Sequence, residues 1–119
     1  MFTRLVEMKS TTGKSQELAE LIYAKAVPIL KQQRGFVDEI VLVAHTEPDR
    51  VFALSFWNNK EDAEKYQRDH YQTIHDALRD FLETEPNIQT FDVHTSLGHN
   101  IAGQKAALQD FDLKRQRLY

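Results

Sequence analysis

The chain has 119 residues, which is enough for one domain with a single core of ordinary size. Hydrophobic residues make up 41% of it and charged residues 28%, which is typical of a folded globular protein rather than a disordered one. The net charge of -3 argues against a nucleic-acid partner, and no apolar run approaches the roughly 18–20 residues that a membrane span needs. The absence of cysteine excludes disulfides, thiolate metal ligands and a cysteine nucleophile. Since the first residues alternate polar and apolar side chains, unlike a signal peptide, we expect a cytoplasmic protein of bacterial type.

The first predicted elements are a strand over residues 2–9 and a helix over about residues 14–33. In the strand, one set of alternating side chains is Phe2, Arg4, Val6 and Met8. Apolar residues at steps of three and four then predict the helix. Pro28 lies within it, so we expect a kink or break near residues 26–27 followed by a final turn through Leu30. Gly35 is expected to end the helix.

Two strands are predicted next, over residues 36–46 and 51–57, joined by a turn at residues 47–50. Asn58 and Asn59 can cap a short helix, and Asp69 with Gln72 repeats that capping signal for a second helix that runs to about Glu83. A last strand follows over residues 88–95. The order strand, helix, strand, strand, helix, strand predicts a ferredoxin-like α+β domain over residues 1–96 with a four-stranded antiparallel sheet.

The two middle strands carry apolar side chains on both faces. Helices on one side of a sheet cover only that side, so the apolar side chains of the second face would remain exposed to solvent. An exposed apolar surface of this kind marks an interaction site, and we expect a homodimer in which the two sheets pack face to face. Residues 97–119 are expected to be a C-terminal tail that is partly ordered, and a segment that reaches across the dimer is the alternative.

The sequence holds no strong catalytic motif. It has no phosphate-binding glycine loop, no zinc-binding H-E-x-x-H and no serine elbow, and the spacing of the five histidines does not predict a metal site. If Asp69 caps a helix, His70 is its first residue, where the helix dipole favours a neutral imidazole that can act as a general base. A partly buried histidine bonded to the neighbouring turn is the alternative for His70. His75 flanks the apolar stripe and either projects into a pocket or binds water at the boundary.

Aromatic residues gather near these histidines, namely Phe56, Trp57, Tyr66 and Tyr71. Such a group is either ordinary core or the wall of a pocket for a flat apolar ligand, with tyrosine hydroxyls that orient it. Ile74 and Leu78 lie on the same predicted helix and would add apolar contacts to the pocket.

Two stretches of the chain resemble a known family. The first is Leu5-Val6-Glu7-Met8-Lys9 with Gly13 before a helix, ending in Gln33-Arg34-Gly35-Phe36-Val37. The second, more specific stretch is Phe56-Trp57-Asn58-Asn59-Lys60-Glu61-Asp62-Ala63-Glu64-Lys65-Tyr66, followed by Asp69-His70-Tyr71 and by residues 88–93. A strand that ends in an aromatic–Trp pair, a short acidic helix and a His–aromatic pair resemble the domains of antibiotic biosynthesis monooxygenases, over residues 1–95.

The resemblance implies a dimer with a cavity between sheet and helices in each subunit. Cofactor-free oxygenases of this family act on quinols or anthrones, so it implies a small or polycyclic aromatic substrate, O₂ and no cofactor. His70 would be the base or hydrogen-bond acceptor, Tyr66 and His75 further catalytic residues, and Phe56, Trp57, Tyr71, Ile74 and Leu78 substrate contacts.

Other branches of the family leave alternatives open. The haem-degrading branch uses an Asn, a Trp and a His; here His75 matches the histidine, whereas Val6 and Tyr66 stand at the other two positions, so haem degradation is the weaker alternative. A branch that isomerises a small phosphorylated sugar would need a basic partner for the phosphate, for which Arg4 and Arg68 are candidates. A ligand-binding dimer without turnover is the third alternative.

Overall fold

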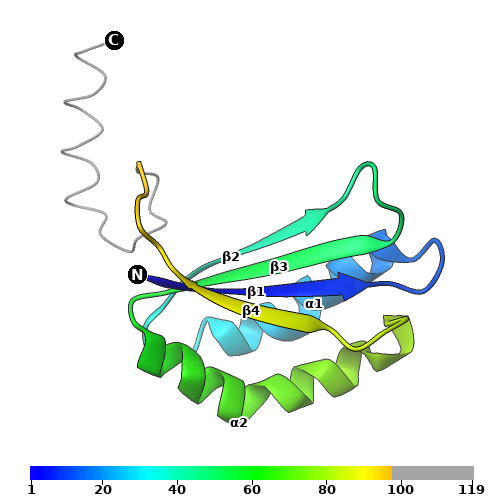
Figure 1. Cartoon of the computed structure of the whole chain (residues 1–119). Coiled ribbons are helices and arrows are strands. Elements are labelled where there is room, and N and C mark those ends of the chain that lie inside the picture. The colour runs from blue at the N-terminus through cyan, green and yellow to red at the C-terminus, as the bar shows by residue number, and fades with distance from the viewer. Residues whose placement is uncertain (98–119) are drawn as a thin grey trace.

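A computed structural model of the chain describes residues 1–97. Its four strands form one antiparallel sheet in the order β2-β3-β1-β4, with β1 (Phe2–Lys9), β2 (Phe36–Val43), β3 (Arg50–Trp57) and β4 (Asn87–Asp92). The helices α1 (Ser15–Leu30) and α2 (Lys60–Leu78) both lie on one side of this sheet (Figure 1). This arrangement confirms the predicted ferredoxin-like α+β fold.

Helix α1 is continuous through Pro28 and ends at Leu30, so the expected break near residues 26–27 does not occur. Its buried residues, Leu18, Ile22, Ala26 and Leu30, follow one another at four-residue steps and hold the helix against the sheet along its whole length. That packing outweighs the single hydrogen bond that a proline removes. Gly35 does not end the helix but takes a left-handed conformation (φ 79°) in the turn that leads into β2.

Helix α2 replaces the two helices expected between residues 58 and 83. Asn59 caps it as predicted, since its side-chain oxygen accepts a hydrogen bond from the backbone N–H of Asp62 at 2.9 Å. Asp69 does not start a second helix; its carboxylate accepts a hydrogen bond from Lys65 one turn earlier at 2.6 Å. After Leu78 the chain forms only a short 3₁₀ helix, η1 (Arg79–Phe81).

Two strands are shorter than predicted. β2 ends at Val43 rather than at residue 46, because its pairing with β3 ends where Val43 faces Val51. β4 ends at Asp92 rather than at residue 95, because Asp92 already pairs with Phe2, the first residue of its partner strand β1. None of the helices in residues 1–97 is long and apolar enough to cross a membrane.

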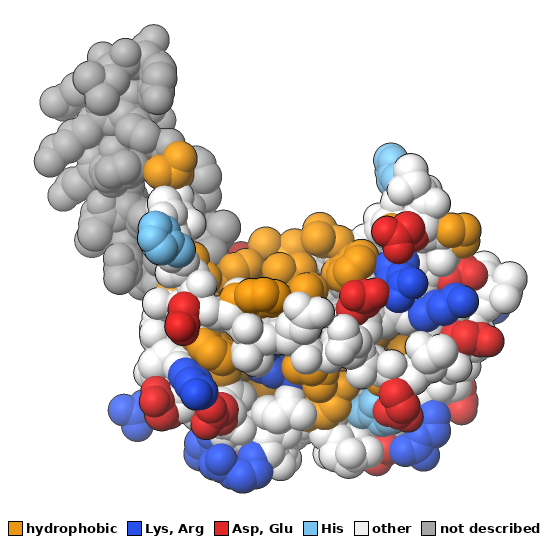
Figure 2. All heavy atoms as spheres, viewed as in Figure 1, with side chains coloured by type: hydrophobic (Ala, Val, Ile, Leu, Met, Phe, Trp, Pro, Cys, Tyr) orange, Lys and Arg blue, Asp and Glu red, His pale blue; other side chains and the backbone are white. Residues whose placement is uncertain are grey.

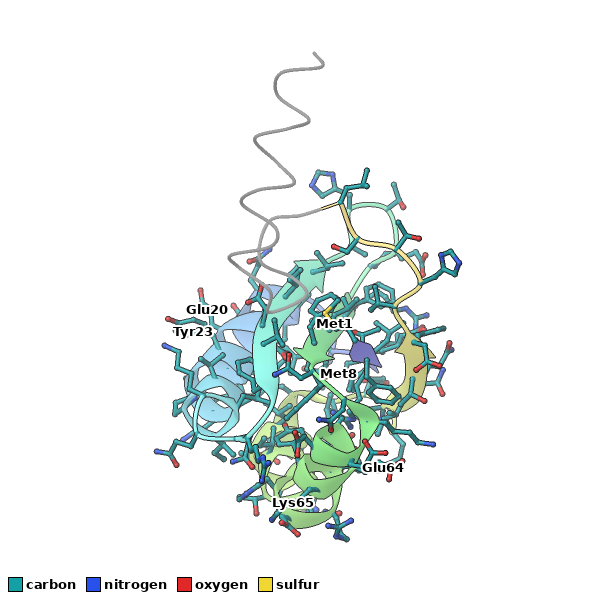
Figure 3. The ribbon with its side chains drawn as sticks, turned by 90° about the vertical axis from the view of Figure 1, so that its left-hand side faces the viewer. Met1, Met8, Glu20, Tyr23, Glu64 and Lys65 are labelled. Atoms are coloured by element: carbon teal, nitrogen blue, oxygen red, sulfur yellow. The ribbon has the colours of Figure 1, made fainter. Side chains whose placement is uncertain are left out.

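The sheet has an inner face against the helices and an outer face on the opposite side. Figure 3 views the two helices side by side, with Glu20 and Tyr23 both on α1. Tyr23 borders a groove between α1 and the edge strand β2. Buried residues with no exposed surface, such as Leu18, Val51, Trp57 and Ala63, form the core between these layers. Figure 2 shows hydrophobic side chains gathered on the outer face, over the strands. The pairing registers place these residues there: Leu5, Ile40, Leu42, Phe52, Leu54, Phe56 and Phe91.

The predicted tail of residues 97–119 lies outside the described residues except for Leu97, so the expectations about its order and its reach remain predictions.

Candidate active site

A cavity lies between the inner face of the sheet and the helices. It encloses about 480 Å³ of empty space when the open solvent at its mouth is counted, and the centres of water molecules can occupy about 40 Å³ of it. Since one water needs roughly 10–15 Å³ by the second measure, the cavity has room for a few water molecules as it stands. Its walls are mostly apolar with a few polar groups, and comprise Arg4, Val6, Met8, Ile22, Ala26, Glu39, Ala53, Ser55, Tyr66, Tyr71, Ile74, His75, Leu78 and Pro86.

Helix α2 brings most of the predicted site residues together. Tyr66, Tyr71, Ile74, His75 and Leu78 all line the cavity, because the helical repeat turns these positions toward the sheet. Trp57 is fully buried beside it, with its ring centroid 5.3 Å from that of Tyr66.

Three predicted residues do not line the cavity: Trp57, which packs beside it, Phe56 and His70. Phe56 lies on the outer face of the sheet, since adjacent residues of a strand point to opposite sides and Trp57 points inward. His70 lies next to Tyr66, with ring centroids 6.3 Å apart, but outside the cavity wall. The prediction that His70 is the first residue of a helix is wrong, because position 70 is in the middle of α2 and Asp69 caps no helix.

Arg4 supplies a buried positive charge to the cavity. Arg4 is only 4% exposed, and one of its terminal nitrogens (Nη2) donates a hydrogen bond to the side-chain oxygen of Gln67. The guanidinium carbon lies 5.5 Å from the ring centroid of Tyr66 and 5.3 Å from that of Tyr71, distances at which the ring faces attract a cation. Burial lowers the pKa of Arg4, although a guanidinium remains charged in proteins.

Glu39 and Ser55 stand beside Arg4 in one polar row across the inner face. Glu39 pairs with Ser55 in the register of β2 and β3, and Ser55 pairs with Arg4 in that of β3 and β1. Burial raises the pKa of the Glu39 carboxyl to about 8, while the nearby charge of Arg4 opposes this shift. Its Oε2 atom is buried without a hydrogen-bond partner. At neutral pH the carboxyl is therefore mostly protonated.

The two tyrosines of the cavity keep their protons over the physiological range. Burial raises the pKa of Tyr66 and also that of Tyr71, and in each case the positive charge of Arg4 acts in the opposite direction. Each phenol can therefore donate a hydrogen bond to a ligand oxygen.

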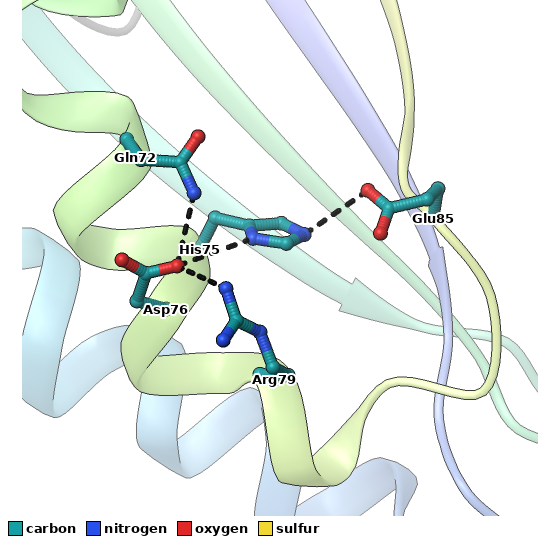
Figure 4. Close-up of polar contacts among 5 residues, drawn as sticks. All are labelled: Gln72, His75, Asp76, Arg79 and Glu85. Carbon is teal, nitrogen blue, oxygen red and sulfur yellow. Dashed lines mark hydrogen bonds and ion pairs between the residues drawn. The ribbon is translucent and has the colours of Figure 1, made fainter.

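His75 is the histidine of the cavity, and its residue is 9% exposed. Figure 4 shows carboxylates on both sides of its ring: the Oε2 atom of Glu85 is 3.2 Å from Nε2, and an oxygen of Asp76 is 3.9 Å from Nδ1. Asp76 is itself held by Gln72, at 2.9 Å, and by Arg79. Neither contact to His75 has hydrogen-bond geometry, and both ring nitrogens are buried without a hydrogen-bond partner. The arrangement suits proton transfer, because the ring can exchange a proton with a ligand at one nitrogen while a carboxylate lies beside the other.

The sequence interpretation did not assign Glu39 or Ser55 to the site, and it considered Arg4 only as a phosphate partner. A signal was nevertheless present, because each of them interrupts an alternating apolar pattern on the side of the strand that faces the core. Residues 1–97 contain no group of three or more His, Asp or Glu side chains placed to hold a metal ion.

Comparisons with known proteins agree with this architecture. The sequence profile of the antibiotic biosynthesis monooxygenase family matches residues 1–77. A comparison with curated protein sequences gives no match. Among solved structures, a mutant of SnoaB, a cofactor-independent oxygenase from Streptomyces nogalater, is similar with a TM-score of 0.68 and 16% identity over 82% of this chain and 97% of that one. A conserved protein from Methanosarcina mazei gives a TM-score of 0.63 and 22% identity over 76% of this chain and 91% of that one. At these identities the two structures support the fold.

Proposed function

Because this chain belongs to the antibiotic biosynthesis monooxygenase family, we propose that it is a cofactor-independent monooxygenase that oxidises a quinol-type aromatic substrate in the cavity between sheet and helices. The observation that carries the proposal is the cavity itself, which combines apolar walls with His75 and the hydroxyls of Tyr66 and Tyr71. Apolar walls with a few convergent polar groups are typical of small-molecule sites.

In the proposed reaction His75 removes the proton of a substrate hydroxyl, and Tyr66 and Tyr71 hold the resulting oxyanion by hydrogen bonds. The electron-rich anion then reduces O₂ and combines with it. One oxygen atom enters the ring and the other leaves as water. The four electrons that O₂ accepts come from the quinol, which ends as a hydroxylated quinone, so no external reductant is needed.

The size of the cavity favours a single-ring substrate over a polycyclic one. The space open to water centres is about 40 Å³, so any substrate has to widen the cavity, and a single ring requires less widening than fused rings do. We therefore place monocyclic hydroquinones first in the substrate panel and anthrones second.

The test is oxygen consumption with that panel. We expect uptake of O₂ with at least one quinol, and a decrease of about 10²–10⁴-fold in kcat for His75→Asn, as is usual when a general base is removed. His45→Asn is the matched control, because His45 is exposed and does not line the cavity. No oxygen uptake with any quinol or anthrone would contradict the oxygenase proposal and leave the isomerase or a ligand-binding dimer. A Soret shift on titration with haem would favour the haem-degrading branch instead.

We further propose that the protein is a homodimer whose outer faces pack against each other. The support is physical: the outer face carries mostly apolar side chains, of which Leu42 is 49% and Phe91 45% exposed, and no helix within residues 1–97 covers it.

A further inference from the structure

We infer that Arg4 is the binding site for a carboxylate on the ligand, so that the substrate class of the cavity is a hydroxylated aromatic acid rather than a neutral quinol. The inference deepens the proposed function, on which it rests for the aromatic ring. Its own basis is the buried positive charge of Arg4 and the groups that surround it.

The positive charge of Arg4 has no counter-ion within the described residues. No carboxylate oxygen of residues 1–97 lies within 4.0 Å of its guanidinium, and its hydrogen bond goes to the neutral amide of Gln67. The other arginines with described ion pairs differ: Arg50 contacts Glu7 at 2.6 Å, Arg68 lies near Asp69, and Arg79 binds Asp76. An uncompensated charge that is 4% exposed is costly, and such residues are normally paired.

Glu39 does not fill the role of counter-ion. It stands in the same polar row but beyond ion-pair distance, and its raised pKa leaves the carboxyl mostly neutral at pH 7. Arg4 therefore presents an uncompensated positive charge to whatever enters the cavity. An anionic ligand would supply the missing partner.

The surroundings of Arg4 also favour a planar anion over a point-like one. The rings of Tyr66 and Tyr71 lie at cation–π distance from the guanidinium carbon, and Gln67 engages Nη2, so the flat group is held in place by several contacts. A fixed guanidinium binds a carboxylate through two parallel hydrogen bonds. An aromatic ring attached to that carboxylate would extend along the apolar walls formed by Val6, Ile74 and Leu78.

A matched pair of ligands tests the inference by calorimetry under anaerobic conditions, so that no turnover occurs. The pair is 2,5-dihydroxybenzoate and its neutral amide, 2,5-dihydroxybenzamide, which have almost the same shape. For the wild-type protein we expect the carboxylate to bind at least about tenfold more tightly than the amide. Equal affinities, tighter binding of the amide, or no binding of either at millimolar concentration would overturn the inference.

Two variants locate the preference at Arg4. Arg4→Gln removes the charge and should abolish the tenfold preference. Gln67→Glu keeps the arginine and places a carboxylate where the neutral amide now binds it, so this variant too should lose the preference, even if Arg4→Gln does not fold. Arg50→Gln is the control, because Arg50 pairs with Glu7 away from the cavity and should leave the preference unchanged. A preference of wild-type size in Gln67→Glu would overturn the inference.

The outcome is separable from that of the proposed reaction. Binding that depends on Arg4 without oxygen uptake would contradict the oxygenase and retain the carboxylate site. Oxygen uptake with neutral quinols that is unaffected by Arg4→Gln would retain the oxygenase and contradict the site.

Discussion

Glu39 places a carboxyl group in the layer between sheet and helices, and this has a consequence for stability. Burial raises its pKa from the ordinary 4.5 to about 8 in the folded protein. Between these two values the folded protein holds a proton on Glu39 that the unfolded chain has lost. The contribution of Glu39 to the free energy of unfolding is therefore full below pH 4.5 and falls as pH rises toward 8.

Glu39→Gln should remove this pH dependence, because glutamine resembles the protonated carboxyl and does not titrate. In the wild type the Glu39 contribution should fall with pH by up to about 1.4 kcal/mol per unit within that window. Urea unfolding of both proteins at pH 5.5, 7 and 8.5 measures the effect, and the variant should gain in relative stability at each step. Glu20→Gln, at an exposed position of α1, is the control. A constant difference between Glu39→Gln and the wild type across the three values would contradict the raised pKa.

The residues of the cavity divide into those that the sequence predicted and those that it did not. The apolar and aromatic positions of α2, such as Tyr66, Ile74 and Leu78, follow from the helical repeat, which is a local property. The closeness of Arg4 and Glu39 to one another depends on strand order, and β1 and β2 are separated by β3 in the sheet. That order is a property of the tertiary fold. The prediction for His70 failed for a related reason. A local capping pattern indicated a helix start at Asp69, and the tertiary fold does not form one there.

At the scale of elements, the proline in α1 is tolerated although it weakens the helix. Pro28 is exposed, and it removes the hydrogen bond to the carbonyl of Ala24, which is also exposed. Pro28→Ala should therefore raise the free energy of unfolding. The gain in helix propensity, about 3 kcal/mol in a helix interior, is reduced by the freedom that the unfolded chain recovers, up to about 1 kcal/mol, and by the position near the helix end. We expect a net stabilisation of about 1–2 kcal/mol in urea unfolding.

Pro48→Ala is the control for that prediction. Pro48 lies in the loop between β2 and β3, where alanine has no helical hydrogen bond to restore. This variant should be no more stable than the wild type. An equal gain in both variants would show that the effect does not come from the helical hydrogen bond of α1, and it would contradict the prediction.

The strands of the sheet were predictable from alternation and turn residues, whereas the number of helices after β3 was not. The pattern Asp69-x-x-Gln72 fits a helix start, but the same side chains can bond along a helix surface, with Asp69 to Lys65 and Gln72 to Asp76. Spacing alone does not separate these uses. One continuous helix forms because its inward side is buried against the sheet along its length. The buried residues are Ala63, Tyr66, Ile74 and Leu78.

At the scale of the whole molecule, the outer face leads to a prediction about assembly. Leu42 lies on that face near the C-terminal end of β2 and is 49% exposed. A charge at this position would be solvated in a monomer and buried in the proposed dimer. Leu42→Glu should therefore shift the protein from dimer to monomer in light scattering coupled to size exclusion, with little loss of secondary structure. Each buried charge without a partner costs several kcal/mol, enough to dissociate an ordinary interface.

Tyr23→Glu provides the matched control. Tyr23 is even more exposed, at 67%, but it belongs to α1, which lies on the side of the sheet opposite the outer face (Figure 1). This variant should keep the mass of the wild type. A monomeric wild-type protein, or a loss of dimer in Tyr23→Glu alone, would contradict packing through the outer face.

The alternation of the strands gives this fold an evolutionary freedom. Arg4 and Leu5 are neighbours in the chain, as are Glu39 with Ile40 and Ser55 with Leu54, yet the first of each pair lines the cavity and the second lies on the outer face. A substitution at one position leaves the other side of the sheet untouched. Descendants of this protein can therefore acquire a new ligand chemistry by changing the polar row alone, while the surface that meets other molecules stays as it is. Among relatives that differ in substrate, variation should concentrate at Arg4, Glu39 and Ser55 and spare the adjacent leucines and isoleucine.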